Sequence, residues 1–290
     1  MSILIQHLIN GLSLGSVYAL LAVGLTLIFG VGRIGNFAHG DFFMIGAFVL
    51  FVGFRQLALP YWPAALVAVA GVTVLALVAN RLIFQPILPR RGPLTLFVAA
   101  MGLSIVLESL ALAIWGATPR DVTTALAYTR LTLGGVTTTA QRLLAIGGAG
   151  AAFLFLQLLL YRTRIGRAIR AVSQNREAAI VVGIEVDRVL AIVFALSGTL
   201  AGIAAVLISP IYTVFPLMGL VLVLKAFAVV IVGGLGSVPG ALAAALLLGV
   251  TESLAAGYIS TMIQDTLAFL AMMLMLLLRP RGLFKGAALQ

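Results

Sequence analysis

The sequence contains no cysteine and few charged residues, and both shortages exclude whole classes of protein. Without cysteine there is no disulfide framework and no thiolate metal site. Only 9% of the residues are charged, against about a quarter in soluble domains, so we expect no soluble domain. The phosphate-binding pattern GxxxxGK[ST] is also missing, so any ATP hydrolysis must come from a partner. The first cation is Arg33, and without a basic N-terminal region a cleaved signal peptide is not expected.

Hydrophobic residues, by contrast, make up 62% of the 290 residues. A membrane-spanning helix needs about 20 apolar residues, and the chain has room for eight or nine of them and little else. We therefore predict an all-α, polytopic membrane protein. It would have one transmembrane domain over residues 1–290, with eight or nine transmembrane helices, some broken or re-entrant. The net charge of +10 does not indicate nucleic acid, because a Lys/Arg excess on one membrane side explains it more simply.

Long apolar runs mark the predicted spans. They cover residues 7–29, 62–83, 94–115, 143–161, 189–208, 217–232, 241–258 and 262–278. A shorter run, residues 42–54, is either a span or half of a re-entrant pair. Two glycine-rich stretches interrupt the apolar pattern and disfavour continuous helix; their helix-breaking residues are Gly35, Gly40, Gly233, Gly234, Gly236 and Pro239. Non-helical backbone at membrane depth is tolerated only where protein or a water-filled cavity covers it.

The most polar stretch, residues 161–188, lies between two apolar runs. It holds nine of the 26 charged residues, six of them arginine. Cytoplasmic loops carry the Lys/Arg excess, so we predict that this loop is cytoplasmic. With the C-terminus on the same side, 13 of the 18 cations lie inside. This count favours an outward N-terminus and a periplasmic location for the Thr-rich loop 116–141, in which β-branched runs around Gly134 and Gly135 predict a hairpin.

Five blocks spread over nearly the whole chain carry a family signature. They are NGLSLGSVYALLAVGLTLIFGVGRIGNFAHGDFFMIGAF (residues 10–48), GRAIRA (166–171), NREAAIVVGI (175–184), KAFAVVIVGGLGSVPGA (225–241) and LRPRGLF (278–284). In this order they resemble bacterial branched-chain amino acid ABC permeases of the LivH type. The resemblance implies a membrane-spanning permease subunit of an importer, forming the translocation pathway for branched-chain or similar hydrophobic amino acids. Related permeases carry urea or short amides, which remain the alternative substrates.

The resemblance also implies partners and a location. The partners would be a second homologous permease subunit, two cytoplasmic ABC ATPases and a periplasmic substrate-binding protein. The location would be the lipid bilayer of a bacterial inner membrane.

Within the polar loop, Glu177-Ala178-Ala179 followed by Gly183 resembles the EAA-type coupling loop of ABC importer permeases, where a short helix docks on the ATPase. We expect a short helix over residues 177–183, with both alanines small enough for close docking. The residues that the resemblance assigns to ATPase coupling are Gly166, Arg167, Arg170, Asn175, Glu177, Ala178, Ala179 and Gly183. The alternative is a solvated loop that only orients the protein in the membrane.

Polar residues near or inside the apolar runs are candidates for the translocation pathway. They are Asn36, His39, Asp41, Glu108, Lys225 and Glu252. A charge inside a span costs about 2.5–3.5 kcal/mol on insertion scales, so the last three need a specific role. The alternatives to a pathway role are interhelical hydrogen bonds, or for Lys225 a side chain that snorkels to the membrane rim.

The three polar residues after the first helix are expected to have different roles. Asn36 and His39 are uncharged near neutral pH and hydrogen-bond weakly, so we expect them in the water-filled pathway, reactive when replaced by cysteine. Asp41 is expected to hold the broken backbone by accepting amide hydrogens. His39 and Asp41 alone do not predict a metal site, because no third ligand is at hand.

Two other function classes are weaker. An ion-coupled secondary transporter would use Asp41, Glu108 and Glu252 as coupling carboxylates, but the helix-bearing cytoplasmic loop argues against it. An intramembrane enzyme would need a Ser/His pair on facing helices or two paired aspartates, and the sequence indicates neither. We therefore predict a transport subunit that is not an enzyme and has no cofactor.

Overall fold

The computed structural model describes residues 2–88, 92–133, 136–279 and 282–284, and most of them are helical. The helices are α1 (Ser2–Gly32), α2 (His39–Phe51), α3 (Tyr61–Ala79), α4 (Gln85–Ile87), α5 (Pro93–Trp115), α6 (Ala125–Tyr128), α7 (Ala140–Arg162), α8 (Arg164–Gln174), α9 (Arg176–Val181), α10 (Val186–Ile208), α11 (Met218–Gly233), α12 (Val238–Tyr258) and α13 (Thr261–Leu278). The π-helical turns η1 (Val52–Gln56) and η2 (Asn80–Phe84) extend α2 and α3. The strands β1 (Arg130–Leu133) and β2 (Val136–Thr139) pair antiparallel, which confirms the hairpin; Gly134 and Gly135 lie outside the described residues.

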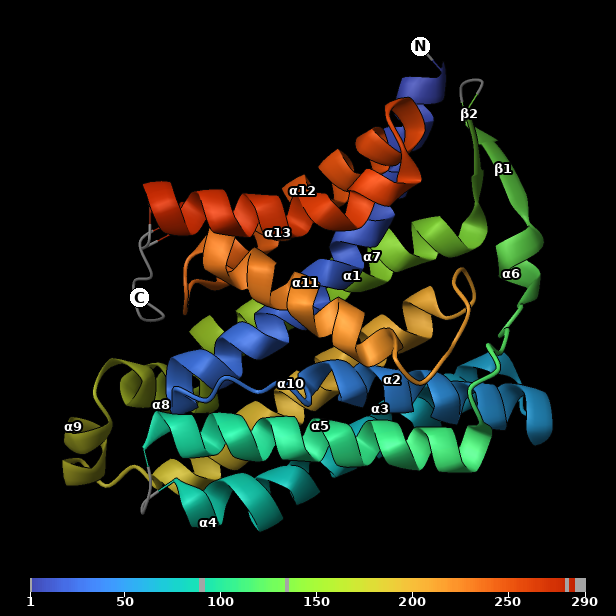
Figure 1. Ribbon diagram of the computed structural model, residues 1–290. Coiled ribbons are helices and arrows are strands. Elements are labelled where there is room, and N and C mark those ends of the chain that lie inside the picture. Colours follow the sequence, from blue (N-terminus) through green and yellow to red (C-terminus); the bar gives the residue numbers. More distant parts are fainter. Residues whose placement is uncertain (1, 89–91, 134–135, 280–281, 285–290) are drawn as a thin grey trace.

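The long helices run between two opposite ends of the molecule (Figure 1). One end, which we call the hairpin end, carries the N-terminus, α6 and the β1–β2 hairpin. The other, the loop end, carries α8, α9 and the C-terminal end of α13. The first residues of α1 and the last residues of α13 therefore lie at opposite ends, as the predicted orientation requires. Which side faces the cytoplasm stays a prediction.

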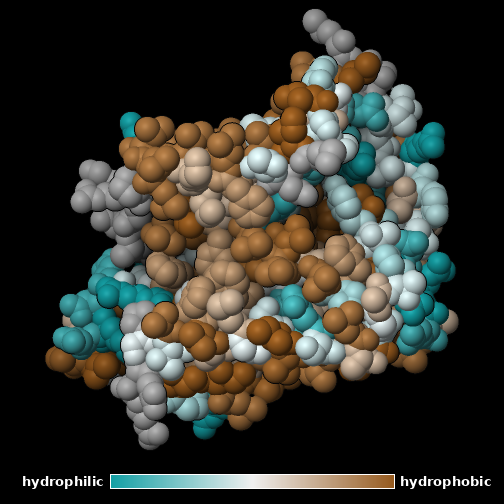
Figure 2. Space-filling model, viewed as in Figure 1, coloured by the Kyte–Doolittle hydropathy of each residue, from teal (hydrophilic) through white to brown (hydrophobic). Residues whose placement is uncertain are grey.

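Among the described residues, six helices are long and apolar enough to cross a membrane: Ile3–Gly32, Tyr61–Ile87, Leu94–Trp115, Ala140–Arg162, Val186–Ile208 and Val238–Tyr258. Two shorter apolar helices are Met218–Gly233 and Thr266–Leu278. Hydrophobic residues cover most of the face seen in Figure 2, and hydrophilic ones gather mainly toward the two ends. A multi-pass, mainly helical membrane protein is therefore confirmed, whereas the number of crossings, eight or nine, is not.

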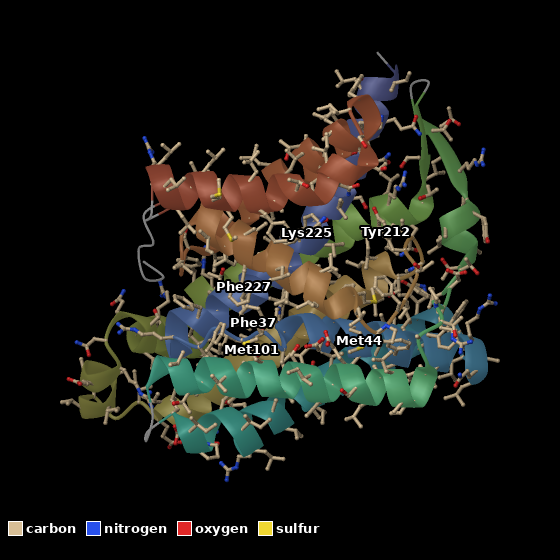
Figure 3. The ribbon with its side chains drawn as sticks, viewed as in Figure 1. Phe37, Met44, Met101, Tyr212, Lys225 and Phe227 are labelled. Atoms are coloured by element: carbon tan, nitrogen blue, oxygen red, sulfur yellow. The ribbon has the colours of Figure 1, made fainter. Side chains whose placement is uncertain are left out.

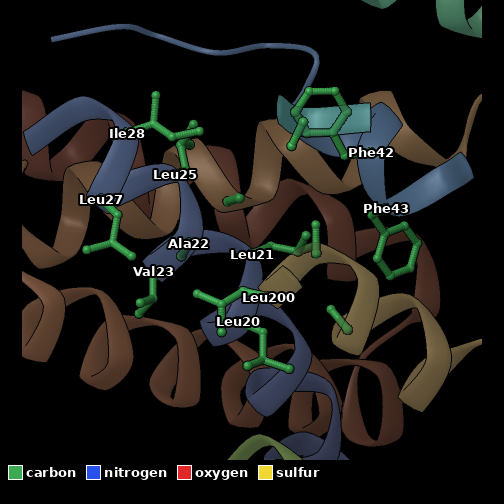
Figure 4. Close-up of a cluster of buried hydrophobic side chains, with 14 of the residues drawn as sticks. Leu20, Leu21, Ala22, Val23, Leu25, Leu27, Ile28, Phe42, Phe43 and Leu200 are labelled. Atoms are coloured by element: carbon green, nitrogen blue, oxygen red, sulfur yellow. The ribbon is translucent and has the colours of Figure 1, made fainter. Parts of the chain in front are cut away.

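Helix α1 forms the centre of the bundle and packs against α7, α10, α11 and α12. Most of its apolar window, 89%, is buried, against 22% for α5 and for α7. Its Gly11 and Gly15 face the α12 backbone, where a methyl group on Gly11 would lie 2.8 Å from the Gly249 carbonyl oxygen. Small residues of this kind let helix backbones approach closely, which matters in lipid because apolar burial does not drive helices together there. Figure 4 shows leucine, valine and isoleucine side chains of α1 in one cluster with Phe42 and Phe43 of α2 and Leu200 of α10.

The first predicted break separates α1 from α2. Residues 33–38 are not helical, and Arg33 adopts a φ of +53°, a left-handed conformation that few non-glycine residues adopt. His39, the first residue of α2, lies beside Leu21 of α1, with 3.1 Å between His39 Nε2 and the Leu21 carbonyl oxygen. The segment therefore folds back along α1, and α2 begins at mid-depth in the bundle (Figure 1).

Of the two glycines assigned to this break, only Gly35 lies in it. Gly40 is helical and belongs to the first turn of α2, so its assignment as a helix breaker is corrected. Its lack of a side chain has another cause, because a methyl group there would collide with the Gly219 carbonyl of α11. Gly40 thus allows the starts of α2 and α11 to touch.

The second break joins α11 to α12 at the loop end. Gly233 is the last residue of α11, and Gly234 and Gly236 follow with φ of +104° and +84°. Both values favour glycine, since side chains rarely adopt them. Pro239 does not break a helix but lies in the first turn of α12, where its missing N–H and fixed φ are tolerated. The turn therefore lies where the glycines predict it, and Pro239 belongs to the first turn of the helix that follows.

Candidate functional site

A cavity of about 230 Å³ lies among α1, α2, α11, α13 and the loop between α10 and α11. Its walls are largely apolar, with contributions from Val17, Phe43, Ile208, Met218 and Val221. Polar groups reach it from Tyr18, Tyr212, Thr213, Lys225 and Gln264. Figure 3 shows Tyr212 and Lys225 on neighbouring parts of the structure, the loop and α11. The volume lies below the roughly 300–1,000 Å³ of typical pockets for drug-sized ligands, so the cavity suits a small molecule with a mainly apolar body.

Lys225, Glu252 and Tyr18 form a buried polar cluster at the wall of this cavity. Lys225 Nζ lies 3.0 Å from Glu252 Oε1 and donates to Oε2 over 3.1 Å. The Tyr18 hydroxyl donates to the same Oε2 over 2.7 Å and accepts from Nζ over 3.0 Å. Lys225 is 4% exposed and Glu252 0%. The structure therefore shows an ion pair inside the bundle and excludes snorkelling of Lys225 to the rim.

Three helices must pack correctly to build this cluster. Tyr18 lies on α1, Lys225 on α11 and Glu252 on α12, and the glycine contact between α1 and α12 keeps two of these helices close. A buried ion pair contributes less to stability than well-packed apolar residues of similar volume often would. Packing alone therefore does not explain why three polar residues meet here.

Asn36 and His39 do not lie at this cavity. His39 is fully buried: its Nε2–H donates to the Leu21 carbonyl, and its Nδ1 accepts from the Ser197 hydroxyl of α10 over 3.2 Å. Asn36 is also fully buried, and both of its amide atoms lack a hydrogen-bond partner among the described residues. The expectation that both side chains face a water-filled pathway is not met in this conformation. His39 instead ties the start of α2 to α1 and α10.

Asp41 is bound by a side chain of another helix. Its Oδ2 accepts from the Ser104 hydroxyl of α5 over 2.5 Å, while Oδ1 is buried without a hydrogen-bond partner among the described residues. Glu108 lies one turn beyond Ser104 on α5 and is half-buried. Asp41 therefore joins α2 to α5, and Glu108 belongs to the same side of the molecule rather than to the Lys225 cavity.

The polar loop folds as two short helices at the loop end (Figure 1). Thr163 caps α8 by accepting from the Gly166 N–H over 3.0 Å, and Asn175 caps α9 by accepting from the Ala178 N–H over 3.0 Å. Such side-chain caps satisfy N–H groups that have no intrahelical partner. Gly166 is buried against the Leu160 carbonyl of α7, so it fixes the turn between α7 and α8.

The outer surface of α9 and its end is apolar and exposed. Ile180, Val181 and Val182 have exposed fractions of 56%, 86% and 74%. Ala178 is exposed on the same helix, whereas Ala179 is buried against the protein. The suggestion that both alanines face a docking partner is therefore corrected for Ala179, whose small side chain lets α9 lie close to its own chain.

Gly183 ends α9. Its φ is +82°, its N–H donates to the Ile180 carbonyl, and the Ile184 N–H donates to the Ala179 carbonyl over 3.0 Å. A glycine with positive φ and this pair of hydrogen bonds forms a Schellman motif, a common end of an α-helix. The observed helix spans Arg176–Val181 rather than residues 177–183.

Of the two arginines assigned to coupling, Arg167 is exposed on α8. The Arg170 guanidinium lies over the Tyr161 ring at 4.9 Å. Arg170 thus braces α8 against the end of α7, and Arg167 is the one that faces solvent.

A second, polar cavity of about 340 Å³ separates this loop from the end of α1. One wall is Gly30, Val31, Gly32 and Arg33; the other is Val172, Ser173, Gln174, Asn175, Arg176 and Glu177. We call it the junction cleft, because it lies where α1 ends, α8 ends and α9 begins.

Comparisons with known proteins agree with this architecture. Residues 7–278 match the family described as branched-chain amino acid transport system / permease component. The chain belongs to this family. It is 32% identical, over 96% of its length and 94% of the relative, to the high-affinity branched-chain amino acid transport system permease protein LivH of Salmonella typhimurium. It is also 32% identical to the BraD permease protein of Pseudomonas aeruginosa, over 96% of this chain and 95% of that one.

The fold also resembles a solved structure, PsaBC from Streptococcus pneumoniae in complex with Fab. The TM-score is 0.51 with 13% sequence identity, and the alignment covers 94% of this chain and 91% of that one. This similarity supports the fold alone. Family membership itself confirms the resemblance that the five sequence blocks indicate.

In this member of the permease family, three partners of the candidate pathway residues are not predicted from the sequence. Tyr18, Ser104 and Ser197 pair with Glu252, Asp41 and His39. No local pattern marks them, because a serine or tyrosine in an apolar run is common. The sequence gives one indication of them: a charged residue inside a membrane span predicts that a polar group of another helix faces that charge.

Proposed function

We propose that this chain is the membrane-spanning permease subunit of an ABC importer in a bacterial inner membrane, and that it carries branched-chain or similar hydrophobic amino acids. The relatives named above are permease proteins of branched-chain amino acid transport systems. The mainly apolar cavity with one charged cluster at its wall supports the same substrate class. Urea and short amides fit less well, because they have no apolar body to contact those walls.

The importer would also contain a second homologous permease, two cytoplasmic ATPases and a periplasmic binding protein. The observation that supports the ATPase contact is the exposed apolar end of α9. Three consecutive apolar side chains, residues 180–182, are exposed at the polar loop end rather than in the lipid-facing belt. An apolar patch with a polar rim is typical of a protein interaction site. We infer that it is the contact for an ATPase.

The test is a charge placed in that patch. Val181→Glu adds a carboxylate at the most exposed of the three residues, so the permease should insert normally yet retain less ATPase during purification and import less leucine. A matched control is Tyr128→Glu, which makes the same kind of change at a residue 73% exposed on α6 at the hairpin end. That variant should keep its ATPases.

The proposal fails if Val181→Glu retains ATPase and imports leucine like the unmodified protein. It fails equally if both variants lose ATPase to the same extent, since the effect would then not be local to α9.

A further inference from the structure

Only some groups of the cluster formed by Lys225, Tyr18 and Glu252 face the cavity, and these groups indicate which kind of ligand it binds. Lys225 and Tyr18 line the cavity of about 230 Å³, and Glu252 is fully buried beside them. The cavity thus meets the ammonium and the phenol, while the carboxylate lies farther from it. A ligand in the cavity would meet the Lys225 ammonium as the donor of this cluster, because the Tyr18 proton is already donated to Glu252, and it would meet no exposed acid of the cluster.

Glu252 also limits how strongly Lys225 binds an anion. The ion-pair distance of 3.0 Å means that the carboxylate neutralises most of the ammonium charge. A ligand carboxylate must therefore share Lys225 with Glu252. A charge-assisted hydrogen bond is roughly twice as strong as a neutral one. Because Lys225 also stays bound to Glu252, the ligand carboxylate gains only part of that strength. The cavity therefore recognises the carboxylate without holding it tightly, which suits a pathway that must release its substrate.

The remaining walls match the rest of an amino acid. Apolar residues from four elements surround the space, and they suit an aliphatic side chain. Tyr212 and Gln264 also line it and carry oxygen atoms that accept hydrogen bonds from an ammonium group.

We propose that Lys225, with Tyr18 beside it and Glu252 behind it, is the point at which the cavity recognises the α-carboxylate of its substrate. The cavity then selects zwitterionic amino acids with an aliphatic side chain over uncharged amides and over amines that lack a carboxylate. This proposal rests on the proposed importer function.

The first experiment measures occupancy of the cavity in the assembled importer. The chain has no cysteine, so Val221→Cys, at a residue that lines the cavity and is 45% exposed, gives one reactive thiol. Leucine should slow its reaction with a membrane-impermeant thiol reagent. Leucinol has the same side chain and amine but no carboxylate. Its protection of the thiol should be weaker than that of leucine by a factor of about ten or more, the loss of affinity expected for one charge-assisted hydrogen bond.

A control thiol and a paired variant sharpen this measurement. Tyr128→Cys, at a residue 73% exposed on α6 and outside the candidate spans, should react at the same rate with and without leucine. Lys225→Met with Glu252→Met removes both charges together, which avoids the uncompensated buried acid that Lys225→Met alone would leave. In this background leucine and leucinol should act alike, and leucine uptake should fall about tenfold or more while ATPases stay bound.

The outcomes separate this proposal from the importer function. Equal protection by leucine and leucinol in the unmodified cluster, protection by neither at concentrations that saturate uptake, or normal leucine uptake by the paired variant would each show that the cluster is structural. If the unmodified complex with bound ATPases takes up no leucine at all, the importer function itself is wrong.

Discussion

The contact between α1 and α12 makes a strong quantitative prediction, because glycine backbones touch there. A methyl group on Gly249 would collide with the Gly15 backbone and lie 2.5 Å from the Gly11 carbonyl oxygen. Carbon atoms prefer separations of about 3.5–4.0 Å, so Gly249→Ala must move the two helices apart by roughly 1 Å. Overpacking of this kind costs about 1–3 kcal/mol.

The matched control is Gly102→Ala in α5, where a methyl group would have no neighbouring atom within 4 Å. Alanine is favoured over glycine in helix interiors by about 1 kcal/mol in water, so this change should be neutral or slightly stabilising. The assay is thermal unfolding of the purified permease in detergent. Gly249→Ala should unfold at a temperature several degrees lower, and Gly102→Ala should not.

Movement at Gly249 should also reach the polar cluster, since Glu252 lies less than one turn away on α12. Leucine import should therefore fall more than stability alone explains, even at temperatures where the variant is folded. Unfolding at the same temperature for Gly249→Ala and the unmodified permease would refute the described α1–α12 contact.

Two further predictions concern single side chains. Asn36→Leu should raise the unfolding temperature, because it removes two buried amide atoms that have no hydrogen-bond partner among the described residues. The gain in the free energy of unfolding should be about 1–3 kcal/mol. A lower unfolding temperature would show that the amide is hydrogen-bonded in the native protein. Gly183→Ala should loosen the end of α9, since φ there is +82° and alanine tolerates it poorly, so ATPase retention should fall with insertion unchanged. Gly71→Ala, at a glycine with no close neighbours in α3, is the control, and equal retention by the two variants would contradict the prediction.

Much of the fold could be predicted because membrane helices have simple requirements. Apolar length alone locates the spans, and the positions of Gly35, Gly234 and Gly236 locate both breaks. The hairpin follows from β-branched runs around paired glycines. The resemblance to a coupling loop predicts the short helix α9 near its observed bounds but not α8. Family membership followed from the order of five sequence blocks.

The partners of each helix could not be predicted. The helices are apolar all round, so periodicity does not show which face is buried against protein and which meets lipid. Tyr18 lies 207 residues from Lys225 and 234 from Glu252 in sequence, and nothing local connects them. For the same reason Asn36 and His39 were expected in the pathway. Polarity marks them as special, but the α10 hydroxyl that orients His39 becomes visible only in the fold.

The junction cleft gives the first helix break a place in the proposed mechanism. If α9 receives the motion of an ATPase, the displacement first meets the end of α1, because residues 30–33 and 174–177 form opposite walls of this cleft. Arg33, with its left-handed φ, is where the chain leaves α1. Four residues later the Phe37 ring packs against Phe97 of α5 and Phe227 of α11, at centroid distances of 5.0 and 4.7 Å, and Figure 3 shows Phe37 and Phe227 close together. Only a short segment of chain connects the cleft to this aromatic contact. We infer that a shift of this segment at the loop end moves α5 and α11 relative to each other while α1 stays helical. Lys225 lies two residues before Phe227 on α11, which connects the same movement to the cavity.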